Sequence, residues 1–171
     1  MVEYKVKSIK YNFIMNFILT VSNFLFPLLT FPYVSRVLQV EANGKVAFVS
    51  SVVSYFMMIG SLGIPTYGIR AASRVRDNKK KLSIVVQELL IINLCLVAVV
   101  LSCYFVAILN IKTFYEYREL FYINSVGILL NVLGMNWFFQ ATEQYAYITI
   151  RSIVFRIISI ILLFTLIHNP S

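Results

Sequence analysis

The sequence predicts an all-α membrane protein, a polytopic bundle of about five transmembrane helices. Three observations predict this fold class: 60% of the 171 residues are hydrophobic, only 13% are charged, and the mean hydropathy is +0.82. A soluble domain carries roughly 25% charged residues, and a soluble chain of this size buries only about 70% of its surface. So apolar a chain would leave large apolar patches in water, whereas a bilayer removes that cost.

Five apolar windows predict where the helices lie. A hydrocarbon core of about 30 Å needs about 20 helical residues, and the first four windows reach that length. The fifth reaches it only with Arg151 at its edge and Arg156 within it. The expected helices lie near residues 11–35, 46–69, 86–111, 120–142 and 147–168 of a single transmembrane domain that covers residues 1–171. Transmembrane strands would alternate with a period of two over about ten residues, a pattern that these windows lack.

The first window follows Lys5, Lys7 and Lys10, as the apolar part of a secretory signal would. It is too long for a signal, whose apolar region has about 7 to 15 residues, so we expect it to remain as a helix. Polar and proline residues at spacings of three and four confine a stripe to one face of this helix. Interhelical hydrogen bonds and the wall of a hydrated cavity both explain the stripe, which comprises Asn12, Asn16, Thr20, Asn23, Pro27 and Thr30.

Small and polar residues also mark faces of the second, third and fourth windows. Pro65 predicts a kink, and the glycines around it permit close helix approach. In the fourth window Asn131 shares a face with Asn124 and two glycines, while Asn136 and Gln140 lie roughly opposite, so both faces should meet protein or water. Glu88, at the start of the third window, could pair with an arginine, carry a proton or be solvated at the interface.

Arg156 is the most informative charged residue, because a guanidinium near mid-span costs about 2.5 to 3.5 kcal/mol on insertion scales. It shares a helix face with Thr149, Ser152 and Ser159. One explanation is that the side chain extends to the cytoplasmic headgroups. The other is that it faces a cavity and binds an anionic substrate.

The positive charges predict the orientation. The N-terminus, the second loop and the fourth loop with the start of the last helix carry eleven Lys/Arg, against four on the other side. This asymmetry places the N-terminus in the cytoplasm, and the largest basic block, residues 70–81, becomes a cytoplasmic loop that faces anionic lipids. The block lacks interleaved stacking aromatics, so we expect no nucleic-acid partner.

Missing motifs argue against most enzymes. His168 is the only histidine, so no zinc motif can be assembled, and Gly44-Lys45 lacks the rest of a P-loop. Cys95 and Cys103 would lie about 12 Å apart on one helix, too far for a disulfide. We therefore expect no enzyme activity, no cofactor and no metal site.

Several segments resemble the polysaccharide biosynthesis protein family, the O-antigen and capsule flippases of the multidrug/oligosaccharidyl-lipid/polysaccharide exporter superfamily. They are LTFPYVSRVL (29–38), VEANGKVAFV (40–49), SLGIPTYGIR (61–70), RVRDNKKKL (74–82) and NWFFQATEQYAYITIRSIVFRIISI (136–160). Relatives are expected to carry glycine at the positions of Gln39 and Ala141.

The resemblance implies a bacterial inner-membrane transporter of twelve to fourteen helices in two related bundles. The implied cargo is an undecaprenyl-pyrophosphate-linked oligosaccharide repeat unit, and implied partners include the polysaccharide polymerase and chain-length machinery. This chain would be a truncated N-terminal lobe, inactive alone. Two alternatives stay open: a cation-coupled drug exporter of the same superfamily, and a small structural membrane protein that assists polysaccharide assembly.

The resemblance also implies roles for particular residues. Basic candidates for binding pyrophosphate or closing gates are Arg36, Arg70, Arg151 and Arg156, and candidates for hydrogen bonding in the cavity are Asn23, Asn131, Asn136 and Gln140. A diphosphate that crosses an apolar layer needs paired cations and donors, and the planar fork of arginine suits phosphate oxygens.

Overall fold

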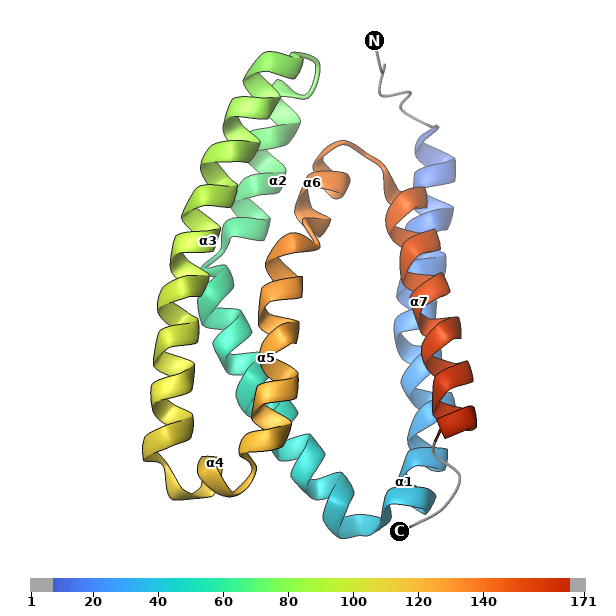
Figure 1. Cartoon of the computed structure of the whole chain (residues 1–171). Helices are drawn as coiled ribbons and strands as arrows, with labels where there is room; N and C mark the ends of the chain where they lie inside the picture. The colour runs from blue at the N-terminus through green and yellow to red at the C-terminus, as the bar shows by residue number, and fades with distance from the viewer. Residues whose placement is uncertain (1–7, 167–171) are drawn as a thin grey trace. The chain divides into compact units, whose positions relative to one another are not determined.

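The computed structural model describes residues 8–166, which form helices and no strand (Figure 1). Its helices are α1 (Ile9–Ser61), α2 (Ile64–Val75), α3 (Lys79–Asn110), α4 (Lys112–Glu116), α5 (Arg118–Leu133), α6 (Asn136–Ala141) and α7 (Tyr145–Leu166). Four stretches within the described residues are long and apolar enough to cross a membrane: Ile9–Val75, Lys79–Asn110, Arg118–Ala141 and Tyr145–Thr165. The all-α, polytopic fold class is confirmed.

The first stretch, of 67 residues, contains the first two expected helices, and α1 is interrupted within it at Gln39. Gln39 has φ 60° and ψ 172°, which is not helical. Residues on both sides of Gln39 are helical, so the expected loop between residues 35 and 46 is wrong. Charge alone placed that loop, whereas one residue with a positive φ suffices to interrupt a helix.

The second and fourth expected helices are each divided, contrary to the continuous spans 46–69 and 120–142. α1 ends at Ser61, and α2 begins at Ile64 after Gly63, whose φ is 73°. Pro65 lies in the first turn of α2, where its missing N–H costs nothing, so the break falls beside the expected kink. Met135, with φ 43°, separates α5 from α6.

The third expected helix begins earlier than residue 86. α3 starts at Lys79 because Asn78 caps it, its Oδ1 accepting a hydrogen bond from the Lys81 backbone N–H at 3.2 Å. Long lysine side chains can keep their charge in water while their backbone is helical. For the fifth expected helix, 147–168, α7 covers residues 145–166, and residues 167 and 168 lie outside the described part.

The chain divides into two compact units, and the single domain expected over residues 1–171 stays a prediction. Of the described residues, unit 1 comprises 8–43 and 142–166, and unit 2 comprises 44–141. In unit 1 the first part of α1 and α7 run parallel, because contacts pair Met15 with Thr149 and, further along both helices, Tyr33 with Phe164. The rings of Tyr33 and Phe164 lie 4.4 Å apart.

Unit 2 has two hydrophobic clusters, one on each side of the helix breaks. The lower cluster in Figure 1 joins the second part of α1 to α3 and α5, and includes Val53, Val97, Tyr104 and Phe121. The Tyr104 hydroxyl donates to the Phe121 carbonyl at 2.7 Å. The upper cluster joins α2, α3 and α6 through Ala72, Leu82, Leu89, Trp137 and Ala141. Within unit 2, α3 is the helix that continues unbroken from one cluster to the other (Figure 1).

Candidate functional site

Arg156 of α7 is held by two polar side chains of α1. Its Nη1 donates to Ser22 Oγ, and its Nη2 donates to Asn23 Oδ1. Its guanidinium carbon lies 5.9 Å from the centroid of the Phe26 ring, within range of a cation–π interaction. The structure therefore brings together two predicted site residues, Arg156 and Asn23, that are 133 positions apart in the sequence.

Arg156, Ser22 and Asn23, here called the arginine cluster, lie deep in their helices. Arg156 is eleven residues beyond Tyr145, the start of α7, which corresponds to about 16 Å along the axis at about 1.5 Å per residue. Half of a hydrocarbon core is about 15 Å. The headgroup explanation requires the side chain of Arg156 to extend toward the start of α7. Both of its terminal nitrogens donate to α1 instead.

The guanidinium keeps binding capacity in this arrangement. Arginine carries five N–H donors, and the bonds to Ser22 and Asn23 use one donor from each terminal nitrogen. Arg156 is half-buried and Asn23 is exposed, so part of the cluster is open to a ligand. Chemically, the remaining donors suit the oxygens of a phosphate or carboxylate.

A second contact fixes the register of α7 on α1. Thr149 is 1% exposed, and its Oγ1 donates to the Met15 carbonyl at 2.9 Å. Thr149 and Met15 each lie seven residues before a member of the arginine cluster, Arg156 and Ser22, so the two contacts lie two helical turns apart on the same pair of faces. This register places Arg156 opposite Ser22 and Asn23.

The other predicted basic residues have different surroundings. In unit 1, Arg36 is exposed on α1, and Arg151 is half-buried with its guanidinium carbon 5.6 Å from the Tyr147 ring centroid. In unit 2, Arg70 is exposed on α2. These residues are not among the partners of Arg156 that the structure shows.

The predicted residues of the third and fourth spans belong to unit 2 and do not form a cluster. Asn131 and Asn136 are exposed, at the end of α5 and the start of α6, and Gln140 is half-buried on α6. Glu88 is exposed on α3, and within residues 8–166 it forms no ion pair.

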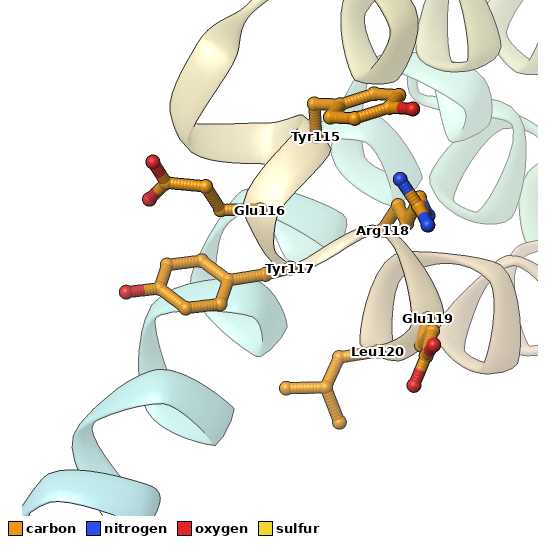
Figure 2. A pocket seen from close by; sticks show the side chains of 6 residues that line it. All are labelled: Tyr115, Glu116, Tyr117, Arg118, Glu119 and Leu120. Atoms are coloured by element: carbon orange, nitrogen blue, oxygen red, sulfur yellow. The ribbon is translucent and has the colours of Figure 1, made fainter.

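A hollow of about 450 Å³ lies at the turn between α4 and α5. In Figure 2, Tyr115 and Arg118 lie on one side of this turn, while Glu116 and Tyr117 point to the other. The Arg118 guanidinium carbon is 4.6 Å from the Tyr115 ring centroid. The lining comes from six consecutive residues, 115–120, and includes none of the predicted site residues.

Comparison with known proteins identifies the family. The model of the family described as "Polysaccharide biosynthesis protein" matches residues 9–171, nearly the whole chain. The chain belongs to the polysaccharide biosynthesis protein family. This confirms the resemblance seen in the sequence, and with four apolar spanning stretches it identifies a membrane protein.

Two curated relatives carry the name "Putative O-antigen transporter". The chain is 26% identical to the one from Shigella dysenteriae over 162 residues, which cover 95% of this chain and 40% of the relative. It is 25% identical to the one from Escherichia coli (strain K12) over 150 residues, which cover 88% of this chain and 36% of the relative. The chain thus spans about two fifths of the length of these relatives. No solved structure matches it.

Ser22 was not among the site residues predicted from the sequence of this family member. Ser22 lies beside the polar stripe of α1, about 100° around the helix from Asn23. Its adjacency to Asn23 in an apolar run is the signal that could have found it. Asn93 of α3 was also missed, and it is the only buried asparagine among the described residues of unit 2.

Proposed function

We propose that this chain forms part of a flippase that moves an undecaprenyl-pyrophosphate-linked oligosaccharide repeat unit across the bacterial inner membrane, with Arg156 binding the pyrophosphate. One observation carries the proposal: an arginine near the middle of an apolar helix is held by Ser22 and Asn23 with donors to spare. Family membership and relatives named as O-antigen transporters support transport of a polysaccharide precursor, and support transport over catalysis.

The physical argument concerns the cost of moving a diphosphate through hydrocarbon. A doubly charged headgroup needs cations and hydrogen-bond donors along its path, because water is absent there. Arg156 supplies a charge that the protein already stabilises, through two hydrogen bonds and the Phe26 ring. Asn23 contributes an amide, exposed beside the guanidinium, whose Nδ2 can donate to the same anion.

The basic block at residues 70–81 supports the proposed orientation and a lipid partner. Arg70, Arg74 and the three lysines at 79–81 are exposed, at the end of α2 and the start of α3. Each Lys or Arg near an anionic membrane surface contributes about 1 kcal/mol of attraction. We propose that this block faces anionic lipids on the cytoplasmic side, as the N-terminus does. Contact with the polymerase and chain-length machinery stays a prediction.

The drug-exporter alternative finds less support in the charges. An exporter of cations favours carboxylates within its spans, whereas the charged residue held between α1 and α7 is Arg156. The carboxylate considered for such a role, Glu88, is exposed on α3.

Binding of undecaprenyl pyrophosphate to the chain in nanodiscs tests the proposal. Hydrogen bonds to charged groups contribute about 1.5–3 kcal/mol, so Arg156→Gln should weaken binding about 10- to 100-fold. Arg156→Lys keeps the charge but loses the planar fork, so its affinity should lie between those of the parent chain and Arg156→Gln. Undecaprenol, which lacks the pyrophosphate, should bind the parent chain and the variants alike.

Arg118→Gln is the matched control, because Arg118 is exposed at the start of α5 and contacts Tyr115. It should bind undecaprenyl pyrophosphate like the parent chain. In a full-length flippase that contains this chain, Arg156→Gln should reduce surface polysaccharide while the protein level in the membrane fraction is unchanged. Equal lipid affinity of Arg156→Gln and Arg118→Gln would exclude Arg156 as the pyrophosphate ligand.

A further inference from the structure

A buried amide oxygen without a hydrogen-bond partner lies in unit 2, near the middle of the 32-residue helix α3. Asn93 is 6% exposed, and its Oδ1 accepts no hydrogen bond from any described residue. Leaving a buried polar atom unpaired costs about 1–3 kcal/mol, so such atoms are rare and usually have an unseen partner such as a water or an ion.

Asn93 lies at the level where the first helix break occurs. A Cβ added at Gly60 would lie 3.3 Å from a methyl group of Val97, so these two residues face each other. The second part of α1, which belongs to unit 2, and α3 run antiparallel, as Figure 1 shows. Asn93 lies one turn before Val97 on α3. It is therefore at the level of the residues one turn after Gly60, where the break around Gly63 occurs.

The second break, between α5 and α6, lies at nearly the same level. Trp137 follows this break by two residues, and its ring lies against Gly68, which follows the first break by five residues. α2 and α6 pack against each other and both lead away from the breaks (Figure 1). At about 1.5 Å per residue the two breaks are within about one helical turn of each other. Trp137 and Leu89, one turn from Asn93, belong to the same cluster.

The two breaks direct backbone oxygens toward this level. Carbonyl groups point toward the C-terminal end of a helix, which carries a partial negative charge. α1 ends at Ser61 and α5 ends at Leu133, so both helices present this end to the breaks. The Ser61 carbonyl cannot receive the usual helical hydrogen bond, because the residue four positions later is Pro65.

We propose that the level of the two breaks is a binding site for an alkali-metal cation, with Asn93 Oδ1 as its side-chain ligand and carbonyls at the ends of α1 and α5 completing the set. Neutral oxygens are ligands for hard cations, and carbonyls of interrupted helices bind such ions within membranes. This cation site departs from the expectation of no metal site, which considered zinc motifs and not neutral oxygen ligands. A zinc-type site does not fit, since no group of three His, Cys, Asp or Glu occurs among residues 8–166.

Thermal unfolding of the purified chain in nanodiscs tests the site, with chloride salts of sodium, potassium or choline at equal ionic strength. A ligand that binds only the folded state raises its stability, so sodium or potassium at about 100 times its Kd should raise Tm by about 5 °C relative to choline. Asn93→Leu, of similar volume, should abolish this difference. Equal Tm values in the three salts would show that Asn93 binds water or nothing, and would overturn the proposal.

Two further variants keep the test decisive. Asn110→Leu makes the same change at an exposed position of the same helix and should keep the cation dependence. Asn93→Asp keeps the side-chain size and adds a negative charge, so the cation should bind at least tenfold more tightly at pH 8. An Asn93→Asp chain with unchanged cation affinity would count against the site even if Asn93→Leu does not fold.

The cation site does not depend on the proposed flippase function, and the two can fail separately. Arg156→Gln, which removes the proposed lipid ligand in unit 1, should leave the cation-dependent rise in Tm unchanged. Asn93→Leu should in turn leave the affinity for undecaprenyl pyrophosphate unchanged.

Discussion

Gly68 shows how strongly one residue can constrain the packing of unit 2. A Cβ built on Gly68 would lie 2.6 Å from Cε3 and 2.9 Å from Cδ2 of the Trp137 ring. Real Cβ atoms do not approach carbon this closely, and an indole ring cannot bend away. The absence of a side chain at Gly68 therefore allows α2 and α6 to approach, and Trp137 to fill the upper cluster.

We expect Gly68→Ala to destabilise the protein. Overpacking a buried contact costs about 1–3 kcal/mol, and here the ring of Trp137 would have to leave its cluster. Gly44→Ala is the matched control, since no atom lies within 4 Å of a Cβ at Gly44 and alanine is the better helix former. Thermal unfolding in nanodiscs should show a lower Tm for Gly68→Ala alone. If Gly68→Ala were as stable as Gly44→Ala, the ring contact would not be present.

The residues of the arginine cluster could be predicted singly but not as a pair. Arg156 and Asn23 attract attention because polar side chains in apolar spans are costly. Their contact joins positions 133 apart, and the register of α7 on α1 that creates it depends on tertiary packing. Ser22 and Asn93 were not predicted, because the sequence around a single small polar residue does not show which neighbour it faces.

Among the helices, the interruption of α1 at Gln39 has a direct energetic consequence. The combination of φ 60° and ψ 172° is accessible almost exclusively to glycine, and other residues incur about 1–3 kcal/mol of strain. Glycine, which the resemblance implies at this position in relatives, would adopt these angles without strain.

Gln39→Gly should therefore stabilise the chain. Relief of strain, less the extra backbone entropy of glycine in the unfolded state, leaves a gain of about 1 kcal/mol. Gln87→Gly makes the same change at an exposed position inside α3 and should cost about 1 kcal/mol. Tm should rise by a few degrees in the first variant and fall in the second. A fall in both would mean that Gln39 does not have a positive φ.

The positions of the helices were more predictable than their interruptions. Apolar windows identify membrane spans because hydrocarbon excludes charge over about 20 residues. Helix breaks depend on single φ angles. Gly63 and Pro65 signal the break after α1, whereas Met135 adopts a positive φ without being glycine, so its residue type does not signal the break between α5 and α6. The early start of α3 at Lys79 has a local signal, Asn78 as cap, that a search for charge-free windows overlooks.

At the scale of the whole molecule, the direction of each span limits the possible topologies. α3 is continuous over 32 residues and is long and apolar enough to cross a membrane, so we expect its two ends on opposite sides of the membrane. The parallel contacts of α1 and α7 in unit 1 place the starts of these two helices on the same side. Within unit 1 these contacts relate the ends of the two helices to each other, and the basic residues predict which side of the membrane is the cytoplasm.

Cysteine labelling can determine the side. The two cysteines, Cys95 and Cys103, are first replaced by alanine, and single reporters are then placed at the two ends of α3 as Asp77→Cys and Lys112→Cys. Both positions are exposed. Because the block at residues 70–81 should be cytoplasmic, a membrane-impermeant maleimide added to intact cells should label Lys112→Cys at least about tenfold more than Asp77→Cys, and inverted membrane vesicles should show the reverse. Labelling of only Asp77→Cys in intact cells would mean the opposite orientation, with the basic block at residues 70–81 outside. Equal labelling of both reporters in intact cells would show that α3 does not cross the membrane.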